Sequence, residues 1–367
     1  MNVKCNRAAL FEAVQLASSI VPSRTPKEVL RCAKIEAFQD GQKVMVTATD
    51  NEITIKYNIS QVQVAAAGAT VVPADRITAI LRESGDEMVN LEVEEMTCQV
   101  VGQDSRFRIY GYDPADFPVI ESQEKDGAIQ IRAEVLKKMI HRTVFAAARE
   151  HTRYAINGIL WERRGKKLRM VGTDGRRLAQ IDGELSKTTQ EEEQAAIVPV
   201  KVMLVLERIL HDPEEKIEVS FTGNQVHVST SLVEVSGNLV QGRFPKYEDV
   251  IPADCDKKVT IITEPLRSAV RRASLLTNDH SKGILLEFSE GKLCLSSSTP
   301  EAGDAEVTMP VEYAYNQEKI GFNPQYLLEV LRVVDDAEVV FEFSDGSRPG
   351  ILRSGKDFLY VLMPVAV

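Results

Sequence analysis

The sequence predicts an α+β protein made of three structurally similar domains, each with two helices and antiparallel sheets. Two observations carry this prediction. One strand–cap–helix unit occurs three times along the 367 residues, and a second strand–break–helix unit occurs three times in register with it. Alternating polar and apolar residues, typical of half-buried strands, fill the intervals. A repeat of about 125 residues also has the commonest size of a protein domain.

The first unit begins with a short alternating strand and continues into an amphipathic helix. Its strands start at Val3, Ile129 and Val259, which are separated by 126 and 130 residues. Each helix carries apolar residues at offsets of four and seven, which lie on one helical face. These residues are Leu10, Val14, Ala17, then Leu136, Ile140, Thr143, then Leu266, Val270, Ala273. We therefore expect helices over Asn6–Ile20, Arg132–Ala148 and Thr263–Leu276.

The second unit is a strand that runs into a proline and then a helix. Pro73, Pro199 and Pro324 lie near the first helical turn, where a missing N–H has no partner to lose. Between the two units, Asp50-Asn51 and Asp174-Gly175 separate alternating segments, as hairpin turns do. The expected second helices cover Ala74–Glu83, Val200–Leu210 and Gln325–Val334.

Two polar, charged segments that are poor in apolar residues separate the repeats, as linkers do. They are Glu121–Gly127 and Pro252–Lys258. We therefore expect domains over residues 1–122, 127–252 and 257–367.

The composition excludes several classes of protein. With 44% hydrophobic and 27% charged residues, the chain can form sizeable cores and is not intrinsically disordered. It has no run of 18 apolar residues and no apolar leader, so we expect neither a membrane span nor a secretory signal. Five cysteines without a C-x-x-C pair indicate free thiols in a reducing compartment. We expect a cytoplasmic protein without a disulfide framework, a metal or another cofactor.

Four motifs, in this order along the threefold repeat, resemble one known family. They are Arg153-Tyr154-Ala155-Ile156-Asn157-Gly158, Thr173-Asp174-Gly175-Arg176-Arg177-Leu178, Gly242-Arg243-Phe244-Pro245 and Tyr360-Val361-Leu362-Met363-Pro364. The chain resembles the bacterial DNA polymerase III beta subunit, the replicative sliding clamp. The resemblance implies a head-to-tail homodimer that closes as a ring around duplex DNA and acts as a processivity factor, not as an enzyme.

The resemblance also implies the partners. The ring would hold duplex DNA without sequence specificity. It would tether the replicative polymerase catalytic subunit, the clamp loader, and other polymerases and repair proteins through their clamp-binding peptides.

Positive charge gathers on two helix faces although the net charge is −10. Six basic and two acidic side chains lie between Arg132 and Arg153. Such clustering is typical of a surface that faces nucleic acid, whereas the alternative is an ordinary solvated helix face. Under the first interpretation the DNA-facing residues are Arg24, Arg76, Lys137, Lys138, Arg142, Arg149, Arg153, Arg267, Arg271 and Arg272.

The family pattern also places a groove for linear peptides between the second and third domains. Carried over by position, its residues are Ile156, Thr173, Gly175, Leu178, Pro245, Val250, Val361, Met363, Pro364 and Val365. An apolar site with a flexible Met suits varied partners. The chain departs from the family at Asp249 and Ala366, where clamps often carry basic residues. This departure leaves the preference for an acidic peptide residue open.

The ring seam is implied in the same way. Its residues are Arg106, Phe107 and Arg108 on the first domain and Leu275, Leu276, Glu301, Asp304 and Glu306 on the third. Opposite charges on the two sides suit a head-to-tail contact. The alternative for Leu275 and Leu276 is a place in the core.

The sequence contains no nucleophile elbow, P-loop, dinucleotide fingerprint or H-E-x-x-H pattern. We therefore expect no catalytic residue and no metal ligand. The alternative function is a three-domain hydrolase or transferase with an interdomain active site, in which His151 and Asp174 would act. A third interpretation is a purely structural oligomer.

Overall fold

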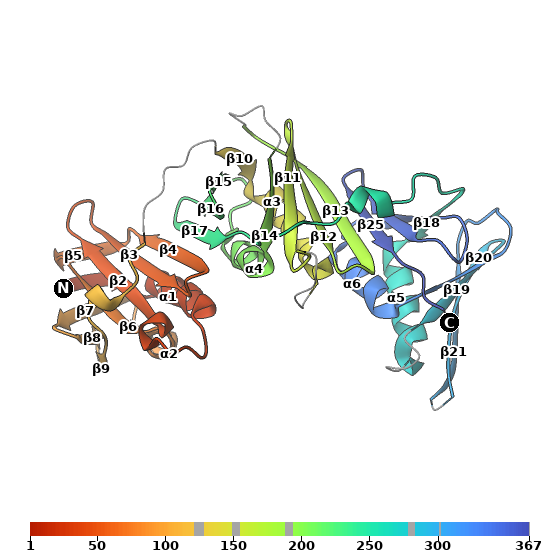
Figure 1. The fold of residues 1–367 in the computed structure, drawn as a ribbon. Coiled ribbons are helices and arrows are strands. Elements are labelled where there is room, and N and C mark those ends of the chain that lie inside the picture. Colours follow the sequence, from red (N-terminus) through yellow and green to blue (C-terminus); the bar gives the residue numbers. More distant parts are fainter. Residues whose placement is uncertain (121–127, 149–154, 188–193, 278–282, 301, 367) are drawn as a thin grey trace. The chain divides into compact units, whose positions relative to one another are not determined.

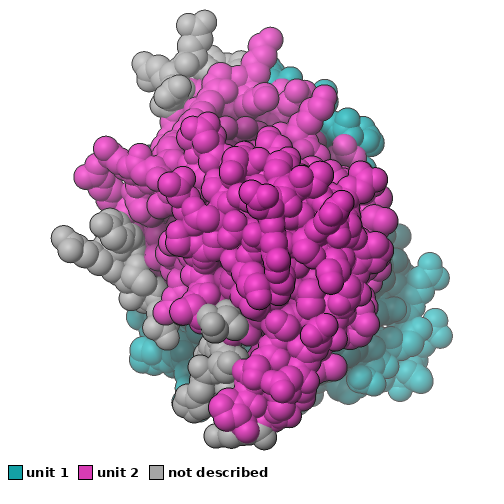
Figure 2. All heavy atoms as spheres, turned by 90° about the vertical axis from the view of Figure 1, so that its right-hand side faces the viewer, with its two compact units in different colours: residues 1–133, 186–190, 204–239 teal, residues 134–185, 191–203, 240–367 magenta. Residues whose placement is uncertain are grey.

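The computed structural model describes residues 1–120, 128–148, 155–187, 194–277, 283–300 and 302–366. The chain divides into two compact units, coloured separately in Figure 2. Unit 1 comprises residues 1–133, 186–190 and 204–239, and unit 2 comprises residues 134–185, 191–203 and 240–367. No helix in the described ranges is both long and apolar enough to cross a bilayer.

Unit 1 contains two antiparallel sheets (Figure 1). The five-stranded sheet has the order β5 (Val62–Ala66), β1 (Asn2–Asn6), β7 (Met88–Glu94), β8 (Thr97–Val101), β9 (Arg106–Tyr110). The eight-stranded sheet has the order β10 (Ile129–Arg132), β15 (Lys216–Thr222), β16 (Gln225–Ser229), β17 (Val233–Asn238), β4 (Ile53–Ile59), β3 (Lys43–Thr49), β2 (Cys32–Phe38), β6 (Gly68–Pro73).

Unit 2 repeats this plan. Its eight-stranded sheet has the order β14 (Gln194–Pro199), β11 (Gly158–Arg164), β12 (Lys167–Thr173), β13 (Arg177–Glu184), β25 (Phe358–Leu362), β24 (Gly350–Ser354), β23 (Glu338–Phe343), β18 (Lys257–Ile262). Its four-stranded sheet has the order β21 (Gly303–Pro310), β20 (Lys292–Thr299), β19 (Ile284–Ser289), β22 (Glu318–Phe322).

Each eight-stranded sheet combines strands of two sequence repeats. In unit 1 the pair β4–β17 joins the first repeat to the second, and in unit 2 the pair β13–β25 joins the second repeat to the third. The compact units therefore cross the predicted linkers. The boundaries 1–122, 127–252 and 257–367 stay a prediction.

Six α-helices lie in the described ranges, at the six predicted places. They are α1 (Arg7–Ile20), α2 (Ala74–Glu83), α3 (Ala133–His141), α4 (Val200–Ile209), α5 (Thr263–Ala273) and α6 (Pro324–Val333). Asn6 caps α1 by accepting a hydrogen bond from the Ala9 N–H at 3.0 Å. The apolar stripes of α1, α3 and α5 are buried, as predicted.

Helices α4 and α6 end one residue earlier than predicted, and α3 and α5 end three or more residues earlier. Helix α3 stops at His141, and a 3₁₀ turn, η3 (Val144–Ala146), follows. The Thr143 hydroxyl donates to the Met139 carbonyl at 2.8 Å, which satisfies that carbonyl while the chain leaves the helix. Helix α5 likewise ends at Ala273 and passes into η5 (Ser274–Leu276).

Candidate functional site

The predicted groove residues lie in unit 2, around the pair of strands β13 and β25. Leu178 and Val361 are directly opposite each other in this ladder, and both are 2% exposed. They belong to a buried apolar cluster that also contains Leu160, Tyr247 and Ile351. This cluster forms an apolar floor.

Three apolar side chains of the predicted groove are exposed to solvent. They are Val250 (49% exposed), Met363 (43%) and Val365 (38%). The Met363 N–H donates to the Arg176 carbonyl at 3.0 Å, which holds the chain terminus against the turn before β13. Exposed apolar groups beside a buried apolar cluster are typical of a binding surface.

The remaining groove residues differ in exposure. Ile156 and Thr173 are buried, Pro245 and Pro364 are half-buried, and Gly175 is exposed. The structure therefore places some predicted residues at the surface and others beneath it.

A tight turn from Thr173 to Arg177 forms one side of the site. The Thr173 hydroxyl donates to the Arg177 carbonyl at 2.6 Å and accepts from the Gly175 N–H at 3.1 Å. Gly175 has φ +86°, a left-handed conformation that favours glycine, and a Cβ there would meet open space. Gly175 thus supplies the backbone conformation that this turn requires.

A polar cluster anchors η4 (Tyr247–Val250), the turn that carries Val250. The buried Tyr247 hydroxyl donates to Glu162 at 2.6 Å, and Arg164 donates to the same hydroxyl and to Glu248, both at 2.9 Å. Burial and the Glu162 carboxylate raise the pKa of Tyr247 well above its usual value. Sequence analysis did not assign these residues, since partners more than 80 positions apart leave no local pattern.

The prediction that Arg142 faces DNA is wrong. Its side chain is 3% exposed, pairs with Asp336 at 3.3 Å and lies over the Phe358 ring at 5.3 Å. A guanidinium buried in this way cannot contact phosphate. The Arg142 N–H still donates to the Lys138 carbonyl at 3.0 Å, so this position continues the helical geometry. The burial comes from Asp336 and Phe358, which belong to the third repeat and which a helical wheel does not include.

The other basic side chains predicted to face DNA differ in exposure. Arg267 is only partly available, because its Nε donates to the Leu331 carbonyl at 2.9 Å. Lys137 is half-buried, and Arg149 and Arg153 lie outside the described residues. The exposed residues are Arg24, Arg76, Lys138, Arg271 and Arg272.

The predicted seam residues lie on the outermost strands of two sheets. Arg106, Phe107 and Arg108 form part of β9, the last strand of the five-stranded sheet, and all three are exposed. Asp304 and Glu306 are exposed on β21, the last strand of the four-stranded sheet. Leu275 is 72% exposed, which excludes a core role, and Leu276 is half-buried. Glu301 lies outside the described residues.

The structure gives no support to the alternative active site. Asp174 Oδ1 accepts the N–H groups of Arg176 at 2.9 Å and Arg177 at 3.1 Å, and its Oδ2 accepts from Arg177 Nε at 3.0 Å. This carboxylate is committed to the turn. His151 lies outside the described residues, and within those residues no three His, Cys, Asp or Glu side chains converge on a metal position.

Comparisons with known proteins identify the family of this chain. Family models of the DNA polymerase III beta subunit match residues 1–121 (N-terminal domain), 130–246 (central domain) and 248–366 (C-terminal domain). The beta sliding clamp of Pseudomonas putida is 32% identical over 100% of both chains. The chain belongs to the DNA polymerase III beta subunit family, the sliding clamps.

Two further clamps are similar to this chain over its full length. The beta sliding clamp of Escherichia coli K12 is 30% identical over 100% of both chains. A crystal structure of the sliding clamp from Pseudomonas aeruginosa bound to griselimycin has a TM-score of 0.94, 31% identity and 100% coverage of both chains. The predicted family and the fold of three clamp domains are thereby confirmed.

Proposed function

We propose that two copies of this clamp close head to tail into a ring around duplex DNA and act without catalysis, in the cytoplasm. The three predicted domain ranges would each supply one sixth of the ring. The observation that carries the proposal is the pair of open sheet edges, β9 and β21, with complementary charge.

An open sheet edge presents unpaired N–H and C=O groups and readily accepts another strand. Arg106 and Arg108 on β9 would face Asp304 and Glu306 on β21 of a second copy. Because the two edges differ, the contact is heterologous, and such contacts form rings when the rotation closes. The exposed apolar side chains Phe107 and Leu275 would be covered at this seam.

The exposed basic side chains on α5 and elsewhere would contact phosphates without reading bases. Such contacts give weak, salt-dependent and sequence-independent attraction, which permits sliding. Retention on DNA then comes from encirclement and not from affinity.

The apolar surface formed by Val250, Met363 and Val365 over the Leu178–Val361 floor would hold peptides of the polymerase, the clamp loader and repair proteins. We also propose it as the site for griselimycin, which the clamps of Pseudomonas aeruginosa and Bartonella birtlesii bind.

The ring is tested on circular DNA. The clamp, loaded on a nicked circular plasmid, should remain bound in high salt and should leave when the plasmid is cut. Retention is measured by gel filtration before and after cutting. Equal retention on linear DNA would contradict encirclement.

The groove is tested by Met363→Ala combined with Leu178→Ala, measured by titration calorimetry with griselimycin. We expect loss of binding with an unchanged dimer mass by light scattering. Val119→Ala controls for the truncation of an exposed apolar side chain such as Met363, because Val119 is 92% exposed and lies in unit 1. Unchanged griselimycin affinity in the double variant would remove the groove assignment.

A further inference from the structure

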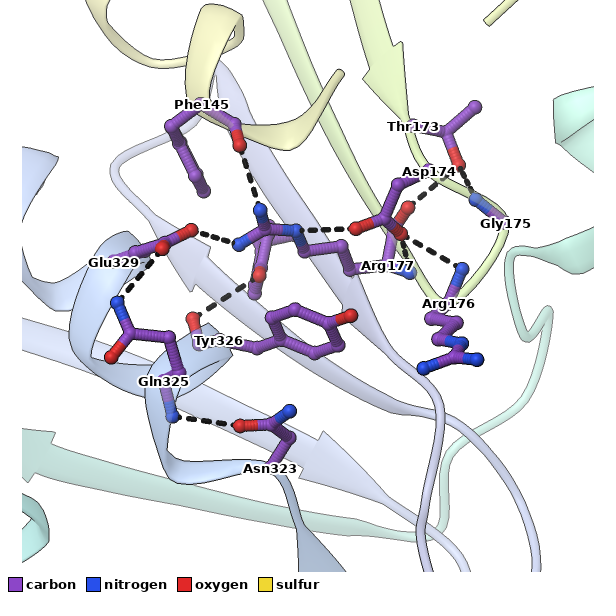
Figure 3. A network of polar contacts seen from close by, with 11 residues as sticks. Phe145, Thr173, Asp174, Gly175, Arg176, Arg177, Asn323, Gln325, Tyr326 and Glu329 are labelled. Carbon is purple, nitrogen blue, oxygen red and sulfur yellow. Dashed lines mark hydrogen bonds and ion pairs between the residues drawn. The ribbon is translucent and has the colours of Figure 1, made fainter. Parts of the chain in front are cut away.

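Arg177 is a buried cation at the edge of the proposed groove that the groove assignment does not use. Its side chain is 7% exposed. Figure 3 shows the polar contacts around its guanidinium. Its Nε donates to Asp174 at 3.0 Å, one terminal nitrogen pairs with Glu329, and the other donates to the Phe145 carbonyl at 2.7 Å. The guanidinium also lies 4.3 Å from the centre of the Tyr326 ring. One side chain therefore joins three separate chain segments.

The contacts of Arg177 extend along α6. Glu329 Oε1 accepts from the side-chain amide of Gln325 at 2.9 Å, and the Gln325 N–H donates to Asn323, the cap of the helix, at 2.9 Å. The Tyr360 hydroxyl of β25 donates to the Tyr326 carbonyl at 3.1 Å. The turn before β13 is thus fixed to both α6 and β25.

Two neighbouring arginines have different surroundings. Arg177 has Asp174 and Glu329 at its guanidinium, so its charge is already balanced inside the protein. Arg176 is exposed, and in Figure 3 its side chain points away from this network. Arg177 is therefore placed to hold the protein together and not to contact a ligand.

We propose that Arg177 is the positioning residue of the groove. It fixes the Thr173–Arg177 turn to α6 and thereby sets the position of Leu178 and of the Arg176 carbonyl that binds Met363. The planar guanidinium supplies donors in a fixed fork, which a lysine ammonium does not reproduce. A site held in its binding conformation loses less entropy when a ligand binds. This inference rests on the proposed peptide-binding function.

The chain offers a matched control in Arg142. Arg142 is 3% exposed, pairs with Asp336 and lies over an aromatic ring, so it resembles Arg177 in burial and in type of contact. It contacts the residue three positions after α6 and does not touch the Thr173–Arg177 turn. Loss of general stability should affect both variants, whereas loss of positioning should affect only Arg177.

The test measures griselimycin affinity by titration calorimetry for Arg177→Met, Arg177→Lys, Glu329→Gln and Arg142→Met. We expect Arg177→Met to weaken binding about tenfold, with smaller losses for Arg177→Lys and Glu329→Gln, because the turn must then be ordered on binding. Arg142→Met should change affinity less than about twofold, since the side-chain contacts of Arg142 are to Asp336 and Phe358 and not to the Thr173–Arg177 turn. The Arg177→Met, Glu329→Gln double variant should lose no more than Arg177→Met alone.

Equal losses in Arg142→Met and Arg177→Met, or an unchanged affinity in Arg177→Met, would overturn the positioning role. If Arg177→Met does not fold, an unchanged affinity in Glu329→Gln overturns it instead. The Met363→Ala variant tests the groove assignment separately from the role of Arg177. If Met363→Ala binds griselimycin as the unmodified clamp does, the groove assignment fails, and the role of Arg177 fails with it.

Discussion

The two eight-stranded sheets build the same junction between repeats from chemically different side chains. In unit 2, Leu178 on β13 pairs with Val361 on β25, which in turn pairs with Ile351 on β24. All three are buried and apolar. This is the floor of the proposed groove.

In unit 1 the corresponding positions are polar. Thr54 on β4 pairs with Ser236 on β17, which pairs with His227 on β16. These three half-buried side chains line a hollow of about 450 Å³. The two junctions share their strand pairing but not their chemistry. The apolar character of the proposed groove therefore depends on a few side chains and not on the backbone framework.

The turns before β4 and β13 also share their backbone hydrogen bonds but differ in their side chains. Asp50 Oδ1 accepts the N–H groups of Glu52 at 2.9 Å and Ile53 at 2.7 Å, just as Asp174 does in the second repeat. Ile53 occupies the position of Arg177. The hydrogen bonds within the turn form without an arginine in the first repeat, so the contacts of Arg177 to α6 and to Phe145 are an addition specific to unit 2.

The largest effect should follow from giving unit 2 the side chains of unit 1. Leu178→Thr with Val361→Ser removes buried apolar volume and buries hydroxyls, so we expect a loss of about 4 kcal/mol in the free energy of unfolding. Urea denaturation measures it. The reciprocal Thr54→Leu with Ser236→Val should change stability by less than about 1 kcal/mol, because these positions are half-buried. Similar losses in both would remove the contrast.

A smaller effect is expected at Gly172, whose counterpart in the first repeat is the buried Ala48. A Cβ at Gly172 would lie 2.6 Å from the Thr143 carbonyl oxygen. We expect Gly172→Ala to destabilise the protein by about 2 kcal/mol through overpacking. The reverse change Ala48→Gly should cost about 1 kcal/mol, through backbone entropy and a lost side chain. A neutral Gly172→Ala in urea denaturation would show that the Thr143 carbonyl can move aside.

Gly175→Asn should cost less than about 1 kcal/mol, because asparagine tolerates the left-handed region. The first repeat has Asn51 with φ +73° at the same turn position. Gly175→Val, with a β-branched side chain, should cost more. Thermal unfolding of the two variants measures the order, and equal losses would contradict it.

The smallest effect concerns acid stability. Hydrogen bonding from the Ser354 hydroxyl, together with the Arg142 charge, lowers the pKa of Asp336. A carboxyl with a lowered pKa stabilises the folded state above about pH 4 and loses this contribution as the pH falls through its folded pKa. Asp336→Asn should therefore flatten the acid limb of the stability curve by less than about 1 kcal/mol, since the side chain is partly exposed.

Asp86, the counterpart of Asp336 in the first repeat, accepts from Ser84 and Gln103 of its own domain. Asp86→Asn is therefore the control for the pH measurement. A steeper acid limb in Asp336→Asn would contradict the assignment.

Local patterns predicted much of this structure. The range Ala74–Glu83 was predicted from the Val-Val-Pro break and the apolar spacing, and α2 has these bounds. The pairs β4–β17 and β13–β25 could not be predicted, because partners from different repeats leave no local signal. The helical wheel did not predict the burial of Arg142, because the side chains that cover it, Asp336 and Phe358, come from the third repeat.

The sheets that span two repeats make the structural units out of phase with the repeats in the sequence. Cutting the chain at either linker would separate two strands that pair with each other. Each of these strands would then become an exposed, aggregation-prone sheet edge. The sequence is a threefold repeat, but each eight-stranded sheet needs strands of two repeats.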